Sequence, residues 1–148
     1  MPQSEAEIFP ETQSIQTHLG IIQSVIQRMA TNSTNSKAWC VSLVAAILVI
    51  VADKGNPDYA WIALMPTIIF AFLDAYYLAL EKGFRESYNN FISKVHQKNL
   101  TEDDLFSVRP AGSMSRHQME ALKSFSIWGF YFSMAFLIFI TKEIALAT

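Results

Sequence analysis

Three long stretches with almost no charge constrain this 148-residue chain more than any other feature. Residues 38–52 and 124–141 contain no Asp, Glu, Lys or Arg, and residues 59–80 contain only Asp74. A helix that spans a bilayer needs about 20 mostly apolar residues, within a range of about 17–25. The stretch 124–141 meets this range alone, and 59–80 meets it if Asp74 is tolerated. The stretch 38–52 meets it once its ends are extended, with Lys37 reaching toward the headgroups.

Buried helices of a soluble protein are the alternative explanation for such stretches. With 51% hydrophobic and 16% charged residues, the chain has too little polar sequence to enclose three of them, since a soluble domain is about 25% charged. No sustained strand-like alternation occurs. We therefore predict an all-α integral membrane protein of one domain, with three transmembrane helices.

The distribution of Lys and Arg predicts the orientation, because cytoplasmic connections carry an excess of both. Nine of the eleven lie before the first span or between the second and third, and only Lys54 and Lys142 lie elsewhere. The N-terminus and residues 81–123 are expected in the cytoplasm, and the turn at residues 53–58 and the C-terminus outside. Gly55, Asn56 and Pro57 suit a tight reversal in that turn, so the first two spans are expected to form a helical hairpin. We predict an N-terminal tail and amphipathic helix at residues 1–36 and a transmembrane hairpin at 37–80. A cytoplasmic helical segment follows at 81–123, and a third transmembrane helix with its tail occupies 124–148.

The N-terminal segment carries an apolar stripe at helical spacing: Ile15, Leu19, Ile22, Ile26 and Met29. Such a helix either lies on a bilayer or packs against protein. Its polar face is rich in Gln and poor in Lys and Arg, whereas a helix on a lipid surface is normally basic. This composition favours packing against protein.

Residues 31–36 form a doubled Thr-Asn-Ser sequence. Asn and Ser disfavour helix interiors and favour caps, so a helix break with Asn35 or Ser36 as cap is the favoured interpretation. The alternative is that these small polar side chains, Asn32 and Asn35 above all, line a narrow aqueous path in an oligomer.

Asp74 is the most informative single residue, because an ionisable group within a span is costly unless it is hydrated or paired. One interpretation places it at headgroup depth, paired with Lys37 or Lys82. The other gives it a role in a pore, a gate or proton movement.

The segment after the second span is expected to be helical. Glu81–Arg85 and Lys82–Glu86 are stabilising i,i+4 pairs, and Thr101 to Asp104 resembles a helix start. Residues 115–118 have the pattern of a capping box that opens the helix of the third span.

Residues with catalytic spacing are missing from the sequence. His18, His96 and His117 lie far apart and outside any metal-binding motif, and the single Cys40 lies within a span. We expect no catalytic residues, no cofactor and no metal, and therefore no enzyme.

Local charge offers one further candidate site. The net charge of the chain is −2, which excludes a globally basic nucleic-acid binder, but residues 82–98 and 109–123 are locally basic. The positive-inside rule demands much of this charge of any cytoplasmic loop. The same residues could instead form a binding surface for a polyanion, with Tyr88 or Phe91 stacking on bases. The candidate ligand-binding residues are Arg85, Tyr88, Phe91, Lys94, Lys98, Arg109 and Arg116.

Several of these segments resemble one family of small bacterial membrane proteins. The residues that carry the resemblance lie within 12–90: His18 to Gln23, Arg28 to Ala30, Asn32-Ser33, Lys37, Pro66, Leu73 to Leu78, Glu81, Phe84-Arg85 and Tyr88. The pattern is similar to that of membrane-channel effectors of anti-phage defence operons, of the SLATT-like and Hailong kinds.

This resemblance implies a homo-oligomeric ion channel in the bacterial inner membrane, which opens on infection and depolarises the cell. In Hailong-type systems the partner is a nucleotidyltransferase whose oligonucleotide product keeps the channel shut. We expect a tetramer in the lipid bilayer, with Asn32, Asn35 and Asp74 on the ion path. The rival hypothesis is a non-conducting membrane anchor that recruits a cytosolic enzyme.

Overall fold

The computed structural model describes residues 13–147, and it describes side chains as far as residue 144. The helices are α1 (Gln13–Lys54), the 3-10 helix η1 (Pro57–Ala63), α2 (Leu64–His96), α3 (Glu102–Phe106), α4 (Met114–Leu122) and α5 (Phe125–Ala147). No strand occurs in this part of the chain, which confirms the all-α prediction.

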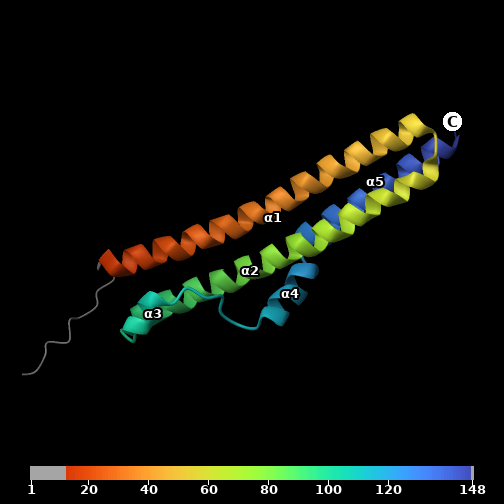
Figure 1. Cartoon of the computed structure of the whole chain (residues 1–148). Coiled ribbons are helices and arrows are strands. Elements are labelled where there is room, and N and C mark those ends of the chain that lie inside the picture. Colours follow the sequence, from red (N-terminus) through yellow and green to blue (C-terminus); the bar gives the residue numbers. More distant parts are fainter. Residues whose placement is uncertain (1–12, 148) are drawn as a thin grey trace, which may run out of the picture.

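A long antiparallel hairpin of α1 and α2 forms the body of the molecule (Figure 1). The chain reverses at Gly55, whose φ of 62° lies in the left-handed region that glycine adopts without strain. The side chain of Asn56 then accepts a hydrogen bond from the backbone N–H of Asp58 at 3.3 Å, and Pro57 opens the 3-10 helix. The hairpin expected from residues 53–58 is therefore present.

One face of α1 is buried along its whole length. The buried residues recur at helical spacing: Ile15, His18, Ile22, Met29, Ser33, Ser36, Cys40, Val44, Leu48 and Val51. At the N-terminal end this face packs on Phe91 and Val95 of α2. The stripe predicted for the N-terminal segment thus contacts protein, as its composition favoured.

The predicted helix break at residues 31–36 is wrong, because α1 continues through the doubled Thr-Asn-Ser sequence. Ser33 and Ser36 occupy the buried face, where small side chains let α2 approach. The hydroxyls of Thr34 and Ser36 donate to the carbonyls four residues earlier, Ala30 and Asn32, so they do not compete for other backbone groups. Tertiary packing overrides the weak helix propensity of these residues.

Helix α5 packs beside the end of the hairpin that carries the turn (Figure 1). Its buried residues are Ile127, Tyr131 and Ile138, and the Tyr131 hydroxyl donates to the carbonyl of Phe70 at 3.0 Å. We call residues 37–80 together with α5 the three-helix part. We call residues 13–32 of α1 with 81–96 of α2 the stalk.

The three longest helical segments are long and apolar enough to cross a membrane: Gln13–Lys54, Pro57–His96 and Phe125–Ile144. The outer face of the three-helix part exposes large apolar side chains such as Trp39, Phe72 and Phe132, each 64–68% accessible. An apolar surface of this kind is suited to lipid or to another protein rather than to water. The fold is therefore compatible with a multi-pass membrane protein.

The helix predicted to run from residue 115 into the third span is interrupted in the structure. Helix α4 begins at Met114, directly after Ser113, and ends at Leu122. The chain then turns at Lys123 and Ser124. The Ser124 carbonyl accepts the N–H groups of Ile127 and Trp128 and so starts α5 as a new helix. The turn lets α4 stay on α2 through His117 and Ala121 while α5 joins the three-helix part.

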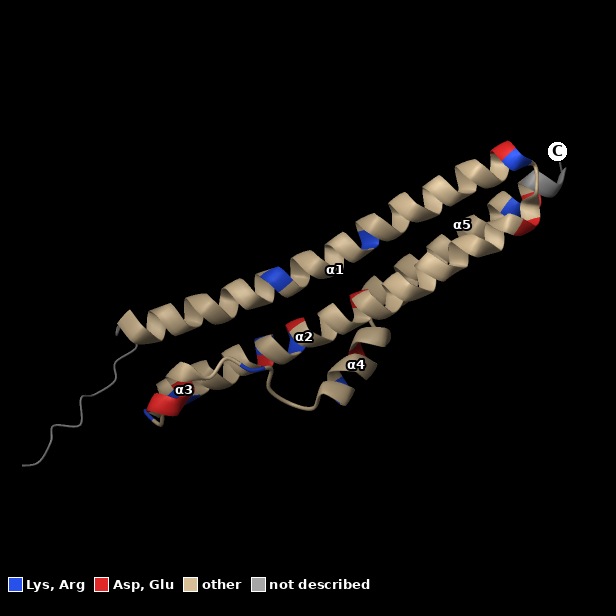
Figure 2. Ribbon diagram, viewed as in Figure 1, with Lys and Arg blue, Asp and Glu red and all other residues tan. Residues whose placement is uncertain are grey.

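Charged residues gather at one end of the molecule, along the stalk, α3 and α4, with a smaller group at the α1–α2 turn (Figure 2). The N-terminal half of α1 and residues 81–123, which are predicted to share one side of a membrane, lie on the same side of the three-helix part (Figure 1). The helix start predicted at Thr101 is confirmed, since its backbone N–H donates to Asp104 Oδ2 at 3.1 Å.

Candidate functional site

A charged cluster lies at the junction of the stalk and the three-helix part. Asp74 is completely buried, and its Oδ1 accepts a hydrogen bond from the Ser33 hydroxyl at 2.5 Å. Lys37 Nζ lies 2.5 Å from Oδ2, outside directed hydrogen-bonding geometry, so it acts as a charge partner. Of the partners considered for Asp74, Lys37 is the observed one.

Lys82, the other partner considered, is directed elsewhere: its Nζ lies 3.5 Å from Glu120 Oε2 on α4. This contact takes the place of the predicted pair with Glu86. The pair Glu81–Arg85 is present as expected, at 2.8 Å.

Helix α5 closes the charged cluster from a third side. The Phe130 ring centroid lies 6.0 Å from Lys37 Nζ, within range of a cation–π interaction. Counting 17 residues from Lys37 to Lys54 at about 1.5 Å each places the ion pair about 26 Å from the turn. A bilayer hydrocarbon core is about 30 Å thick, so the pair would lie just within its inner edge if the turn marks the outer edge.

Asn32 and Asn35 lie at the same level but on the outside of the chain. They line a shallow cleft of about 170 Å³ together with Ser36, Trp39, Phe70, Leu73 and Tyr77. Asn35 is exposed and Asn32 is half-buried. The structure therefore separates the three predicted pore residues: both asparagines line this outer cleft, whereas Asp74 is buried inside the fold.

A second polar cluster fixes the segment before α4 onto α2. The Ala111 N–H donates to the Gly83 carbonyl at 3.0 Å, and a Cβ at Gly83 would lie only 2.8 Å from Pro110 Cβ. Gly83 is thus required by the close crossing. His117, 2% exposed, places Nε2 2.9 Å from the Ala111 carbonyl.

The carboxylate of Glu86 completes this second cluster. It lies 3.4 Å from His117 Nε2 and is also paired with Arg116. Gly112, with a φ of 75°, passes so close to the carboxylate that a Cβ would meet it at 2.8 Å. Glu86 and His117 Nε2 thereby hold the loop in place, whereas the buried His117 Nδ1 has no hydrogen-bond partner among the residues that the structure describes.

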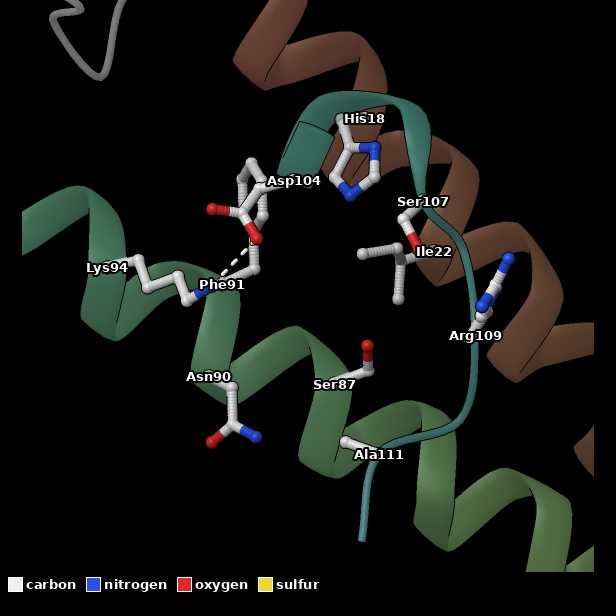
Figure 3. A pocket seen from close by; sticks show the side chains of 10 residues that line it. All are labelled: His18, Ile22, Ser87, Asn90, Phe91, Lys94, Asp104, Ser107, Arg109 and Ala111. Atoms are coloured by element: carbon white, nitrogen blue, oxygen red, sulfur yellow. Dashed lines mark hydrogen bonds and ion pairs between the residues drawn. The ribbon is translucent and has the colours of Figure 1, made fainter. Parts of the chain in front are cut away.

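A cavity of about 140 Å³ lies in the stalk between α1, α2 and the segment 104–111 (Figure 3). It is lined by His18, Ile22, Ser87, Asn90, Phe91, Lys94, Asp104, Ser107, Arg109 and Ala111. On one wall Lys94 Nζ lies 2.7 Å from Asp104 Oδ1. This hydrogen bond with Lys94, supported by Thr101, holds the pKa of Asp104 below its ordinary value.

The predicted polyanion-binding residues fall into separate places. Phe91, Lys94 and Arg109 line the cavity of Figure 3, whereas Arg85 and Tyr88 line a broader cleft of about 680 Å³ between the helices of the stalk. Arg116 lies in the second cluster, and Lys98 follows the end of α2 with a φ of 53°.

Burial and ion pairing limit what these residues can bind. Phe91 is 5% exposed and its ring lies 4.4 Å from that of His18, so its face is not open to a base. Tyr88 is half-buried and its hydroxyl accepts from Gln23 at 3.1 Å. Arg85, Lys94 and Arg116 each already contact a carboxylate of the chain. The predicted ligand residues therefore lie at several separate sites of this chain rather than on one surface.

Several residues of these sites are not evident from the sequence. Ser33, Ser87, Ser107 and His117 are common polar residues without a motif, and only the folded chain brings them together. His18 gave a signal, because it interrupts the apolar stripe on the buried side. Among the residues that the structure describes, no group of three or more His, Cys, Asp or Glu is placed to hold a metal ion.

The fold and these sites define an all-helical chain compatible with a multi-pass membrane protein, with a polar stalk beside its apolar helices. Comparisons with protein-family models, with curated protein sequences and with solved structures found no match to this chain.

Proposed function

We propose that this chain is the protomer of a homo-oligomeric ion channel in the bacterial inner membrane. It acts as an effector of anti-phage defence, controlled by a nucleotide or oligonucleotide ligand on its cytoplasmic stalk. Three helices are too few to surround a water-filled path, so the path lies between protomers. We propose four protomers around one axis.

The cleft at Asn32 and Asn35 is the observation that carries this proposal. The exposed Asn35 amide lies at the end of an apolar span and gains little from lipid, since lipid tails offer no hydrogen-bond partners. Facing a shared axis, the same amides would coordinate water and ions at the cytoplasmic mouth of a pore. Nineteen residues separate Asn35 from Lys54, about 28 Å of helix, which places it close to the inner edge of a hydrocarbon core of about 30 Å.

Asp74 does not line this proposed pore mouth but lies buried behind it and holds α1 in position. Its carboxylate holds Ser33 and Lys37, which flank the asparagines on the same turns of α1. A charged pair at this position keeps α1 and α2 in fixed register, which an ion path between protomers requires. Loss of the pair is expected to alter conduction through the position of α1.

The main alternative is a membrane anchor that recruits a cytosolic enzyme through the stalk. The stalk favours this alternative at one point, because its broad cleft and glutamine-rich face offer a surface for another protein. An anchor needs neither a path for ions nor an oligomer. Flux through purified protein separates the two functions.

The test uses the full chain reconstituted in liposomes that contain a voltage-sensitive or ion-sensitive dye. Asn32→Ala combined with Asn35→Ala is compared with Ser42→Ala, whose hydroxyl is exposed on α1 and bonds only its own helix at the Ala38 carbonyl. A channel gives ion flux that the double variant alters at least several-fold and the Ser42 variant leaves unchanged. Absence of flux from correctly inserted oligomers, with and without oligonucleotides, would favour the anchor.

The defence role needs a test in cells. The chain is expressed alone and together with a nucleotidyltransferase of the kind that the resemblance implies as its partner, and membrane potential is followed with a dye. Depolarisation that the second protein suppresses is the expected result. A potential unaffected by the chain in every combination, with phage infection included, would refute this role.

A further inference from the structure

The stalk cavity of Figure 3 is built differently from the clefts on the surface of the hairpin. Three separate segments of the chain enclose it: α1, α2, and the residues from Asp104 to Ala111, which we call the covering segment. Ser87 on α2 and Ser107 on the covering segment direct their hydroxyls toward the same central space as the ring of His18 (Figure 3). Its walls therefore offer hydrogen-bonding groups from every side.

His18 is the residue that indicates a ligand. It is 4% exposed, with one face of its ring against Phe91. No hydrogen bond joins its ring nitrogens to any residue that the structure describes, and they border the cavity (Figure 3). A buried polar group normally has a partner, so an imidazole directed into a polar cavity calls for one from outside the chain.

The charges around the cavity select an anion. Lys94 and Arg109 are positive, and the one carboxylate, Asp104, is held by Lys94 and by the N–H and hydroxyl of Thr101. Arg109 is exposed at the rim, and its guanidinium forms no ion pair with residues 13–144. The walls thus carry one net positive charge, together with hydroxyl and imidazole groups that donate hydrogen bonds.

The volume limits the ligand to a small one. About 140 Å³ holds several water molecules, since one occupies about 30 Å³ in the liquid. Drug-sized ligands occupy pockets of about 300–1,000 Å³. A nucleobase finds no open ring to stack on, because His18 covers Phe91. A tetrahedral oxyanion meets both the charge and the size.

The position of the cavity excludes a lipid headgroup as the source of this anion. His18 precedes Lys37 by 19 residues, about 28 Å along α1 away from the three-helix part. The headgroup layer extends only about 5–8 Å beyond the hydrocarbon core on each side. The anion therefore comes from solution.

We propose that this cavity binds a phosphate group, either as inorganic phosphate or as the terminal phosphate of a soluble monoester. His18, Ser87 and Ser107 donate hydrogen bonds to its oxygens, and Arg109 closes the rim as the charge partner. The bound anion joins the covering segment to both helices of the stalk. This site is independent of whether the assembled chain conducts ions.

The test measures binding to the full chain, purified in detergent, by calorimetry with inorganic phosphate and with ribose 5-phosphate at constant ionic strength. Arg109→Gln and the pair Ser87→Ala, Ser107→Ala are the test variants. Arg28→Gln, an exposed arginine on α1 outside the cavity, is the matched control. Loss of one charge-assisted hydrogen bond is expected to raise the Kd about tenfold or more in the Arg109 variant.

The two probes distinguish the sources of the phosphate. Binding of inorganic phosphate alone assigns a free-ion site, and equal binding of ribose 5-phosphate assigns the terminus of a monoester. Thermal unfolding of each variant without phosphate checks that it is folded. The proposal is overturned if no saturable binding occurs, or if Arg109→Gln and Arg28→Gln weaken binding equally. It is also overturned if adenosine 5′-monophosphate binds much more tightly than ribose 5-phosphate, since that requires recognition of the base.

Discussion

The ion pair of Lys37 and Asp74 predicts both how much stability each single variant loses and which of the two variants loses more. The atoms Nζ and Oδ2 are 2.5 Å apart, which at an effective dielectric constant of about 20 corresponds to an attraction of about 6–7 kcal/mol. Desolvation costs several kcal/mol for each ion and cancels much of this attraction. Removing one partner of such a pair nevertheless costs about 3–5 kcal/mol, because the other charge stays buried.

The burial of the two side chains is unequal, and this predicts which variant is worse. Asp74 is completely buried and keeps the hydrogen bond from the Ser33 hydroxyl, whereas the Lys37 side chain is 21% exposed and can turn its amine toward water. Lys37→Met should therefore approach the upper end of the range, about 5 kcal/mol, and Asp74→Asn the lower end, about 3 kcal/mol. The double variant leaves no unpaired charge and should lie within about 2 kcal/mol of the natural chain.

The assay is unfolding of the purified chain in detergent micelles, followed by circular dichroism, for both single variants and the double variant. Lys54→Met is the control, because Lys54 is exposed at the end of α1 and forms no ion pair with the residues that the structure describes, so its loss should cost about 0–1 kcal/mol. The reasoning is refuted if the two single effects simply add in the double variant. It is equally refuted if Asp74→Asn proves more destabilising than Lys37→Met.

Three further predictions concern the stalk. Gly83→Ala should destabilise the fold by about 1–3 kcal/mol, because the added Cβ would overlap the covering segment. Gly20→Ala has open space around its Cβ and should stabilise the fold by about 0.5–1 kcal/mol, and thermal unfolding compares the two variants. Phe91→Ala should cost about 3–5 kcal/mol in the same assay, and a loss below about 1 kcal/mol would contradict its place in the core. The lowered pKa of Asp104 means that its pair with Lys94 stabilises above the ordinary Asp pKa of about 3.9 and is lost as the pH falls through the lower folded value. Between pH 5 and 3 the natural chain should therefore lose slightly more stability than Asp104→Asn. The difference should be less than about 1 kcal/mol, because the pair is near the surface. Parallel curves of unfolding free energy against pH for the two proteins would contradict this.

The architecture was predictable from the sequence where one physical signal dominated. Long uncharged stretches predicted the three apolar helices, and the Gly55 to Pro57 sequence predicted the reversal between two of them. The acidic run after Thr101 predicted a helix start, because the capping interactions are local. Each of these signals lies within one segment and does not depend on the rest of the fold.

Two errors arose where long-range packing decides against a local preference. Residues 31–36 have the composition of a break, but Ser33 lies opposite Asp74, 41 residues away, and their hydrogen bond is available only to a continuous α1. The chain turn at Ser124 depends on α4 staying on α2, which no feature of residues 113–125 specifies. The candidate site was predictable only in part for the same reason, since its polar groups come from segments far apart in sequence.

The continuity of α1 and α2 also restricts how the stalk and the three-helix part can influence one another. Sharp helix kinks arise at proline, at glycine–serine pairs or at inserted side chains, and none of these occurs in α1 between Ser24 and Lys37. With the ion pair fixing α1 to α2 at the junction, a bend at residues 31–36 would require the buried Asp74 to lose its partners, at a cost of several kcal/mol. A movement that leaves the pair intact must shift the hairpin as a unit against α5, whose polar contacts with the hairpin include the hydrogen bond from Tyr131 to the Phe70 carbonyl and the pair of Lys142 with the exposed Asp58 at the turn. Tyr131→Phe removes that bond and keeps the ring, so in the proposed channel it should change the dependence of ion flux on a stalk ligand more than it changes the stability of the hairpin.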